Sequence, residues 1–468
     1  MQKCDLPPHT CPPTISEDCL YANVYVPASA KAGAKLPVMF FIPGGRFEQG
    51  TIAAGAGEPD ALYDGERWAG DSNIILVDIQ YRLGAFGFLV TETLEGNYGY
   101  LDQVMALEWV QENIASFGGD PDNVMLFGQS AGGTSTSCHL TANGAEDRNL
   151  FAKAVIESNP FGLILKPPEM AQKTGKHFGK AVGCKSEDAA CLRSKSSAEV
   201  LEGQIVAQNK IDYLEFITAF YPWTPCVDGK VFSQQPIEAI EAGNFKKVPV
   251  MMGSMYNDAL LFIWQAWNHT LPKWEYEALL VDGFHETGFD LMKQYPGTDS
   301  GDNRIILAHL VTQWLFTCPA RRTATAFSQA GVPTFLYQMH HGLSFDAWGP
   351  EFWYCRPGAV EGPYSGAQTT CHGSELPILF FAPDITSMLS PGEVELATDL
   401  NNYWASFARY SDPNKAGTVD LDWPSFNTSS NLNMLFATPS SIESDLWKPE
   451  CDLWDKWGYI YDLSTSDD

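Results

Sequence analysis

The sequence predicts an α/β protein with a mostly parallel central sheet flanked by helices, and three observations carry this prediction. The chain has 468 residues, of which 45% are hydrophobic, so it is long enough to bury a large core. Short apolar runs bounded by Gly, Pro or Asn alternate with stretches of helical periodicity to the end of the chain. No tract rich in Pro, Gly or Ser divides the sequence. We therefore expect one continuous domain over residues 1–468.

Two strands are expected near the start of the chain. Residues 36–45 read LPVMFFIPGG and residues 73–82 read NIILVDIQYR. Both are apolar runs with β-branched and aromatic residues, which is typical of strands buried on both faces of a parallel sheet.

A helix and another strand follow. Leu107, Val110, Ile114 and Phe117 have helical spacing within residues 100–117, and two glycines at 118 and 119 end the pattern. Residues 122–130, DNVMLFGQS, return to a strand, and residues 131–140, AGGTSTSCHL, begin a helix. Ser130 is therefore expected where a strand turns into a helix.

Four further elements extend the alternation. Strands are expected at residues 247–254 (KVPVMMGS) and 333–341 (PTFLYQMHH), and helices near 303–316 and 396–409.

The charge balance limits the partners. The 29 Lys and Arg residues stand against 57 Asp and Glu residues, and a net charge of -28 repels nucleic acid and anionic membranes. No stretch approaches the uninterrupted apolar length that a membrane helix needs. We expect a soluble protein without nucleic-acid partners or an integral membrane segment.

Cysteines and sequons indicate an oxidising, secreted context. The chain has 11 cysteines, and Cys184 and Cys191 bracket a polar segment typical of a small disulfide loop. Asn268 and Asn427 begin Asn-x-Ser/Thr triplets, which are glycosylation acceptors. No two C-x-x-C motifs combine, so no metal site is expected. The first residues, MQKCDLPPHTCPP, show no signal peptide.

Ser130 is the candidate nucleophile. It stands between Gly128 and Gly132 in FGQSAGG, which matches G-x-S-x-G. A tight strand-turn-helix leaves no room for Cβ atoms beside the serine, and the helix N-terminus stabilises a developing anion. The alternative is a plain strand-to-helix turn without chemistry.

Three stretches resemble the type-B carboxylesterases, a family that also contains cholinesterases, fungal lipases and non-catalytic adhesion proteins. They are SEDCLYANVYVP (16–27), GNYGYLDQVMALEWVQENIASFGGDPDNVMLFGQSAGG (96–133) and CHGSELP (371–377). The likeness runs from about Ser16 to about Trp457. It implies the α/β-hydrolase fold, an ester substrate and no cofactor. Family members enter SEDCLY only after a leader and further strands, so N-terminal strands are expected to be missing here.

The resemblance also implies a triad. Ser130 is the nucleophile, His372 the base and Asp258 the acid that orients it, in the chain order expected of this fold. Ala259 stands where the family usually has Gly. Glu375 is an alternative acid, and a hydrogen-bonded core histidine is the alternative for His372.

The oxyanion hole is implied at a run that departs from the family. Where the family has three glycines, this chain has Gly44, Gly45 and Arg46. Backbone N–H groups of Gly45, Arg46 and Ala131 remain available as donors, because they do not depend on the side chain. An inward Arg46 side chain would crowd the acyl side or favour an anionic acyl group, and an outward one would be solvated.

Substrate contacts are expected from Gly44 and from Gln129, which replaces the Glu common in the family. The replacement removes a charge that would attract a cationic alcohol group, so a choline ester is disfavoured. The loop closed by Cys19 is short and lacks the family's Trp and lid.

Further disulfides follow from the resemblance. Cys318 with Cys451 is similar to the family's C-terminal bridge, and Cys19 would pair with Cys4 or Cys11. A bond between Cys355 and Cys371 is one alternative; the other is that each is a small buried residue without a bond. Cys138 and Cys226 are also expected to be small buried residues. The function predicted is a secreted serine esterase of unspecified oligomeric state. The alternatives are a catalytically silent adhesion-like relative and a lipase.

Overall fold

The computed structural model describes residues 14–52, 62–211, 221–299, 301–364 and 369–459. These residues group into two compact units. The first comprises the described parts of Met1–Glu157, Leu165–Val250 and Glu375–Asp422, and the second those of Ser158–Ile164, Met251–Ser374 and Trp423–Asp468. The expectation of one domain over residues 1–468 stays a prediction.

The first unit is built on five strands in the order β1-β3-β2-β4-β5. They are β1 (Ala22–Tyr25), β2 (Leu36–Ile42), β3 (Ile75–Ile79), β4 (Gly119–Gln129) and β5 (Lys153–Glu157). β2 pairs in parallel with β3 and β4, and β4 with β5, whereas β1 is antiparallel to β3. Every residue of β2 and β3 is buried, as expected of strands covered on both faces. The strands predicted at 36–45 and 73–82 are confirmed.

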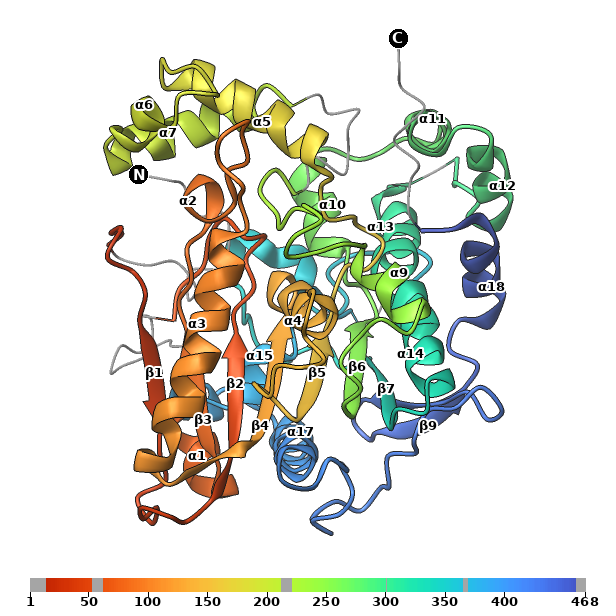
Figure 1. The fold of residues 1–468 in the computed structure, drawn as a ribbon. Coiled ribbons are helices and arrows are strands. Elements are labelled where there is room, and N and C mark those ends of the chain that lie inside the picture. Colours follow the sequence, from red (N-terminus) through yellow and green to blue (C-terminus); the bar gives the residue numbers. More distant parts are fainter. Residues whose placement is uncertain (1–13, 53–61, 212–220, 300, 365–368, 460–468) are drawn as a thin grey trace. The chain divides into compact units, whose positions relative to one another are not determined.

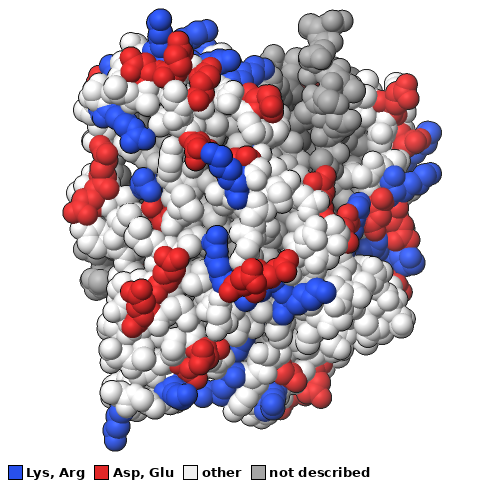
Figure 2. Space-filling model, viewed as in Figure 1, with Lys and Arg blue, Asp and Glu red and all other residues white. Residues whose placement is uncertain are grey.

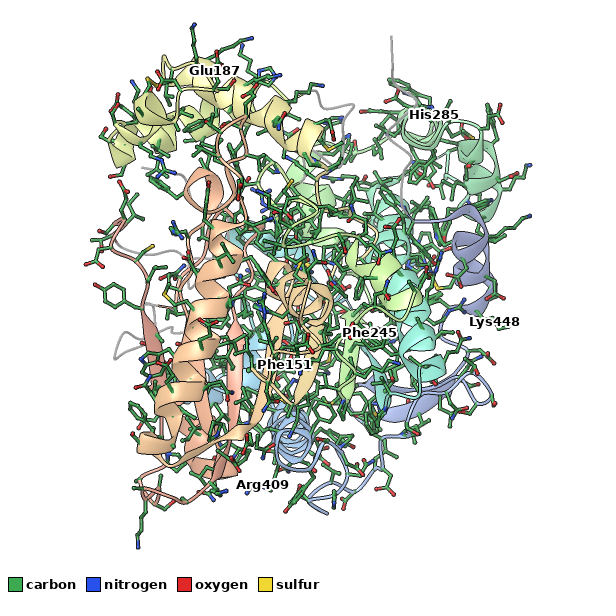
Figure 3. The ribbon with its side chains drawn as sticks, in the orientation of Figure 1. Phe151, Glu187, Phe245, His285, Arg409 and Lys448 are labelled. Carbon is green, nitrogen blue, oxygen red and sulfur yellow. A yellow bond between two sulfur atoms is a disulfide. The ribbon has the colours of Figure 1, made fainter. Side chains whose placement is uncertain are left out.

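Helices cover these strands, with α3 and α4 in front of them in Figure 1. The helices of this unit are α1 (Glu66–Ser72), α2 (Gly84–Phe88), α3 (Tyr98–Asn113), α4 (Ala131–Thr141), α5 (Pro168–Ala181), α6 (Ala189–Arg193), α7 (Ser197–Gln208), α9 (Pro236–Glu241), α15 (Leu376–Phe380), α16 (Pro383–Thr386) and α17 (Pro391–Tyr410). The side chains fill the space between helices and strands (Figure 3). Among them, Arg409 of α17 donates to the carbonyls of Ser72 and Asn73 at the end of α1.

The helix predicted over residues 100–117 is confirmed as α3 followed by a 3-10 turn, Ile114–Phe117. Leu107, Val110 and Ile114 are buried, whereas Phe117 is 39% exposed and packs on the Trp109 ring. Gly118 ends the segment at φ 91°, a left-handed conformation that favours glycine.

The second unit carries strands in the order β6-β7-β8-β9. β7 and β8 are parallel, and β9 is antiparallel to β8. Its elements are β6 (Val250–Met255), α10 (Leu260–Ala266), α11 (Lys273–Phe284), α12 (Thr287–Gln294), α13 (Arg304–Thr312), a π turn (Gln313–Thr317), α14 (Cys318–Gln329), β7 (Thr334–Met339), a 3-10 turn (Pro350–Cys355), β8 (Leu432–Phe436), β9 (Ser441–Ser444) and α18 (Lys448–Trp457). The strands expected at 247–254 and 333–341 and the helix near 303–316 are confirmed. The helix near 396–409 is part of α17.

Among the described residues, three disulfides connect segments within a unit. The predicted bonds Cys184–Cys191 and Cys318–Cys451 are both present. A third bond joins Cys355 to Cys371, and Cys19, Cys138 and Cys226 are free cysteines. The expected bridge from Cys19 is therefore wrong, and its suggested partners Cys4 and Cys11 lie outside the described residues.

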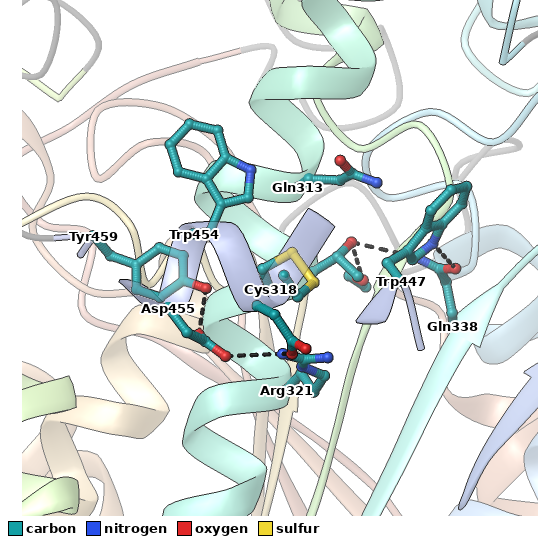
Figure 4. The surroundings of a disulfide bond; sticks show 12 residues. Gln313, Cys318, Arg321, Gln338, Trp447, Trp454, Asp455 and Tyr459 are labelled. Carbon is teal, nitrogen blue, oxygen red and sulfur yellow. Dashed lines mark hydrogen bonds and ion pairs between the residues drawn. A yellow bond between two sulfur atoms is a disulfide. The ribbon is translucent and has the colours of Figure 1, made fainter. Parts of the chain in front are cut away.

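The bond between Cys318 and Cys451 connects α14 to α18 (Figure 4). Beside it, Arg321 of α14 donates to Asp455 of α18 at 2.8 Å, and the hydroxyl of Tyr459 donates to the same carboxylate at 2.6 Å. A covalent bond and an ion pair thus hold the same two helices together.

The surface carries charges of both signs. Figure 2 shows Lys and Arg side chains interspersed with Asp and Glu on the face drawn. Asn268 and Asn427, the two sequon residues, are exposed. A helix that could span a membrane is not found among the described residues.

Candidate active site

Ser130 lies in a strained turn between β4 and α4 of the first unit. Its backbone has φ 61° and ψ -121°, a combination that side-chain-bearing residues rarely adopt. The Ser130 N–H donates to the carbonyl of Glu157, at the end of β5, at 2.9 Å. The turn predicted from FGQSAGG is therefore a strand-turn-helix elbow, held in place by the neighbouring strand.

The glycines around Ser130 are required by close backbone contacts. A Cβ atom on Gly132 would lie 1.9 Å from the carbonyl oxygen of Ile42, at the end of β2. A Cβ atom on Gly128 would lie 2.5 Å from the Gly132 oxygen. Both distances are shorter than any real contact, so only glycine fits at either position.

The segment after β2 packs against this elbow. A Cβ atom on Gly44 would meet the Gln129 carbonyl oxygen at 2.6 Å and the Ser130 Cβ at 3.0 Å. Gly45 and Arg46 follow with φ 116° and 57°. Gly44 therefore lies against the elbow of Ser130, and Gly45 and Arg46 follow it directly in the chain.

Three backbone N–H groups of the predicted oxyanion hole lack a backbone acceptor in the described part of the chain. Among the described residues, the N–H groups of Gly45, Arg46 and Ala131 donate to no backbone carbonyl. Ala131 is the first residue of α4, where a helix leaves its N–H groups unsatisfied and carries a partial positive charge.

The Arg46 side chain turns toward its own loop. Its guanidinium Nη2 lies 3.4 Å from Glu48 Oε2, and the two side chains are 28% and 4% exposed. Gln208 of α7 donates to the other oxygen of Glu48 at 2.7 Å. The charge of Arg46 is therefore balanced by a buried carboxylate, which neither simple alternative for this side chain anticipated.

Tyr221 was missed in the sequence analysis. Its hydroxyl hydrogen-bonds the side chains of Ser130 and Thr134, and its ring packs edge-on against Phe47 at 5.7 Å. The residue is 3% exposed, and burial raises the pKa of its phenol. Nothing in the surrounding sequence, FYPWTP, signals this contact, because it joins residues far apart in the chain.

The second unit holds the other predicted catalytic side chains. His372 Nδ1 lies 2.6 Å from Asp258 Oδ1, and Asp258 is completely buried. The second carboxylate oxygen accepts from the Met255 N–H at 2.8 Å and from the Ser158 hydroxyl at 3.1 Å. A carboxylate in its ionised form only accepts hydrogen bonds, so its contact with His372 requires the proton on Nδ1.

Aromatic rings enclose the imidazole of His372. The rings of Phe262 and Phe316 lie 5.0 and 5.3 Å from it, centroid to centroid. Phe262 belongs to α10. Glu375, the alternative acid, lies in the first unit and Asp258 in the second.

Two features define the class of α/β-hydrolases. One is a serine at the tight turn between a strand of a parallel sheet and the following helix, and the other is a buried Asp-His pair. The chain belongs to the carboxylesterase family, whose model matches residues 1–454. The predicted family and fold are therefore confirmed.

Two similar proteins come from Dictyostelium discoideum. The cAMP-regulated D2 protein is 34% identical over 466 residues, which are 97% of this chain and 81% of the relative. The crystal protein is 36% identical over 475 residues, 98% of this chain and 81% of the relative.

A mammalian enzyme is also similar. Carboxylesterase 1D of Rattus norvegicus is 33% identical over 440 residues, 89% of this chain and 73% of the relative.

Proposed function

We propose that the protein hydrolyses carboxylic esters through an acyl-enzyme, with Ser130, His372 and Asp258 as its triad. Membership of the carboxylesterase family supports ester hydrolysis in general. The observation that carries the specific proposal is the 2.6 Å hydrogen bond between His372 and Asp258, because it leaves one basic nitrogen on an oriented imidazole.

The chemistry takes two steps. His372 Nε2 accepts the proton of the Ser130 hydroxyl as Oγ attacks the ester carbonyl, and the N–H groups of Gly45, Arg46 and Ala131 bind the resulting oxyanion. The carbon–oxygen bond to the alcohol then breaks, and the alcohol leaves with the proton from the imidazole. Water repeats the attack on the acyl-enzyme, releases the acid and restores the serine. No cofactor takes part.

The test is hydrolysis of a short and a long p-nitrophenyl ester by the wild type and by Ser130→Ala. Ser137→Ala is the matched control, because it removes a buried hydroxyl of α4 that donates to the carbonyl of Gly133 in the preceding turn of the helix. We expect turnover by the wild type and the control, and loss of about 10³-fold or more in kcat for Ser130→Ala. Equal rates in all three proteins would refute the role of Ser130.

Two features narrow the range of expected ester substrates. Gln129 carries no charge beside the nucleophile, which disfavours a cationic alcohol group such as choline. The Arg46 charge is offset by Glu48, so we infer that Arg46 contributes to the shape of the acyl side rather than to recognition of an anion. The kinetics of Arg46→Gly test this: an unchanged preference between neutral and anionic esters is expected, and a lost preference for anionic esters contradicts it.

A silent adhesion-like protein and a lipase are the alternatives. The names of the two Dictyostelium relatives state no enzymatic activity, which is compatible with the silent alternative. No hydrolysis of any ester by folded protein would support it. A lipase would show a rise in activity at a triglyceride interface, which we do not expect.

We also propose a secreted, glycosylated protein. Three disulfides in the described part of the chain and exposed asparagines in both sequons support this. Protein made in a eukaryotic secretory system should lose mass on treatment with an N-glycosidase, and Asn268→Gln with Asn427→Gln should abolish the change. An unchanged mass of the wild type would refute glycosylation.

A further inference from the structure

A buried polar contact joins the segment that carries Asp258 to the segment that carries His372, and Asn257 forms it. Asn257 is 0% exposed and directly precedes Asp258. Its backbone N–H donates to the carbonyl of Thr370 at 3.2 Å, and its side-chain Oδ1 accepts from the Thr370 N–H at 3.4 Å. Thr370 is two residues before His372, so a residue next to the acid holds a residue close to the base.

The Asn257 side chain also hydrogen-bonds a second residue of the segment that leads to His372. Asn257 Nδ2 donates to the carbonyl of Tyr364 at 3.1 Å. Tyr364 has φ 68°, and its ring is stacked on the buried ring of His309 with centroids 3.7 Å apart. Asn257 therefore uses its acceptor on Thr370 and its donor on Tyr364, and an amide of this length offers both groups at once.

Thr370 is also tied to the strands of its unit. Its Oγ1 accepts from the Tyr256 N–H at 3.0 Å and donates to the carbonyl of Met339, at the end of β7, at 3.2 Å. The adjacent Cys371 is bonded to Cys355. These contacts hold Thr370 relative to the sheet, and Asn257 connects this fixed point to the acid.

We propose that Asn257 is a positioning residue for the Asp258–His372 pair. The inference rests on the proposed function of that pair. Asn257 contacts no reacting atom in this role. It sets the separation and angle between the carboxylate and the imidazole through its bonds to Thr370 and Tyr364. A shift of about 1 Å in a catalytic group costs about 10²-fold in rate, so this control affects kcat rather than KM.

The experiment compares Asn257→Ala with Asn303→Ala. Asn303 is a matched control in the same unit: it is 0% exposed, its Oδ1 accepts from the Thr298 N–H at 2.7 Å, and its Nδ2 donates to the Leu271 carbonyl at 3.0 Å. Both changes remove a buried amide that connects two loop segments. Only Asn257 is bonded to the segment that carries His372.

Three quantities are measured in each variant: thermal stability, kcat and KM for p-nitrophenyl acetate, and the low-field proton NMR signal of the His372 Nδ1 proton. We expect both variants to lose stability. Only Asn257→Ala should lose about 10- to 100-fold in kcat at nearly constant KM, and only in it should the low-field signal weaken or shift. If Asn257→Ala does not fold, Asn257→Asp, which keeps the acceptor and loses the donor, is compared with Asn303→Asp.

Two results overturn the proposal. One is a kcat that falls equally in the Asn257 and Asn303 variants after correction for the folded fraction. The other is an unchanged low-field signal in Asn257→Ala. If the wild type hydrolyses no ester, the proposed function fails, and the NMR comparison then decides the role of Asn257 by itself.

Discussion

We expect Glu157 to make the free energy of unfolding depend on pH. The side chain is 0% exposed at the end of β5, and its backbone carbonyl receives the Ser130 N–H. Oε1 accepts from Trp404 Nε1 at 2.8 Å, whereas Oε2 has no hydrogen-bond partner in the described part of the chain. Burial raises the pKa of this carboxyl from 4.5 to about 8, against a smaller lowering by the Trp404 hydrogen bond.

The size of the effect follows from the difference in proton binding. Between pH 4.5 and 8 the unfolded chain releases the Glu157 proton while the folded protein keeps it. The folded state binds more protons, so the free energy of unfolding falls as pH rises. A shift from 4.5 to about 8, at about 1.36 kcal/mol per unit, gives about 5 kcal/mol as an upper limit. This stability is fully present below pH 4.5 and is lost as pH rises to 8.

The perturbation is Glu157→Gln, which keeps an acceptor for Trp404 and removes the titration. Urea unfolding is measured at intervals from pH 5 to pH 8, with Glu108→Gln on the exposed face of α3 as a control for net charge. We expect Glu157→Gln to be close to the wild type at pH 5 and several kcal/mol more stable at pH 8. Burial also raises the pKa of Asp78 to about 8, so the free energy of unfolding should keep a residual dependence on pH in both the wild type and Glu157→Gln.

Parallel stability curves for the wild type and Glu157→Gln would refute the reasoning. They would mean that the folded protein ionises this carboxyl at an ordinary pH, through water or a structural change. A gain of equal size in Glu108→Gln would instead assign the effect to net charge.

Three further outcomes are expected. Ser158→Ala removes the hydroxyl that donates to Asp258, the acid of the proposed triad, at 3.1 Å. We expect kcat to fall about 10-fold at constant KM, because a hydrogen bond to a charged group contributes about 1.5–3 kcal/mol. An unchanged kcat contradicts this. Tyr221→Phe removes the hydroxyl bonded to Ser130, and kcat/KM for a p-nitrophenyl ester should fall about 3- to 10-fold, whereas no change would mean that this bond does not hold the nucleophile. Replacing Cys318 and Cys451 by Ser opens a link across 133 residues and should cost about 5 kcal/mol in urea unfolding, a difference that a reductant must abolish.

Local steric rules made part of this protein predictable. Gly128 and Gly132 flank Ser130 because a Cβ atom at either position would collide with backbone, and this requirement is visible in seven letters of sequence. The strands β2 and β3 were found because they are buried on both faces, which produces uninterrupted apolar runs. The Cys184–Cys191 bond was found because its partners are only seven residues apart.

Contacts between distant segments were decided by the tertiary structure. Asp258 and His372 are 114 residues apart, and their pairing was expected through a family resemblance rather than from spacing. The bond of Cys355 to Cys371 was left open, and Tyr221 and Asn257 were not identified at all. The sequence by itself determined the elbow and the buried strands, because their physics acts between neighbouring residues. The tertiary structure alone decided that Ser130 contacts Glu157 and Tyr221 and that Asp258 contacts Ser158, because these partners lie in remote parts of the chain.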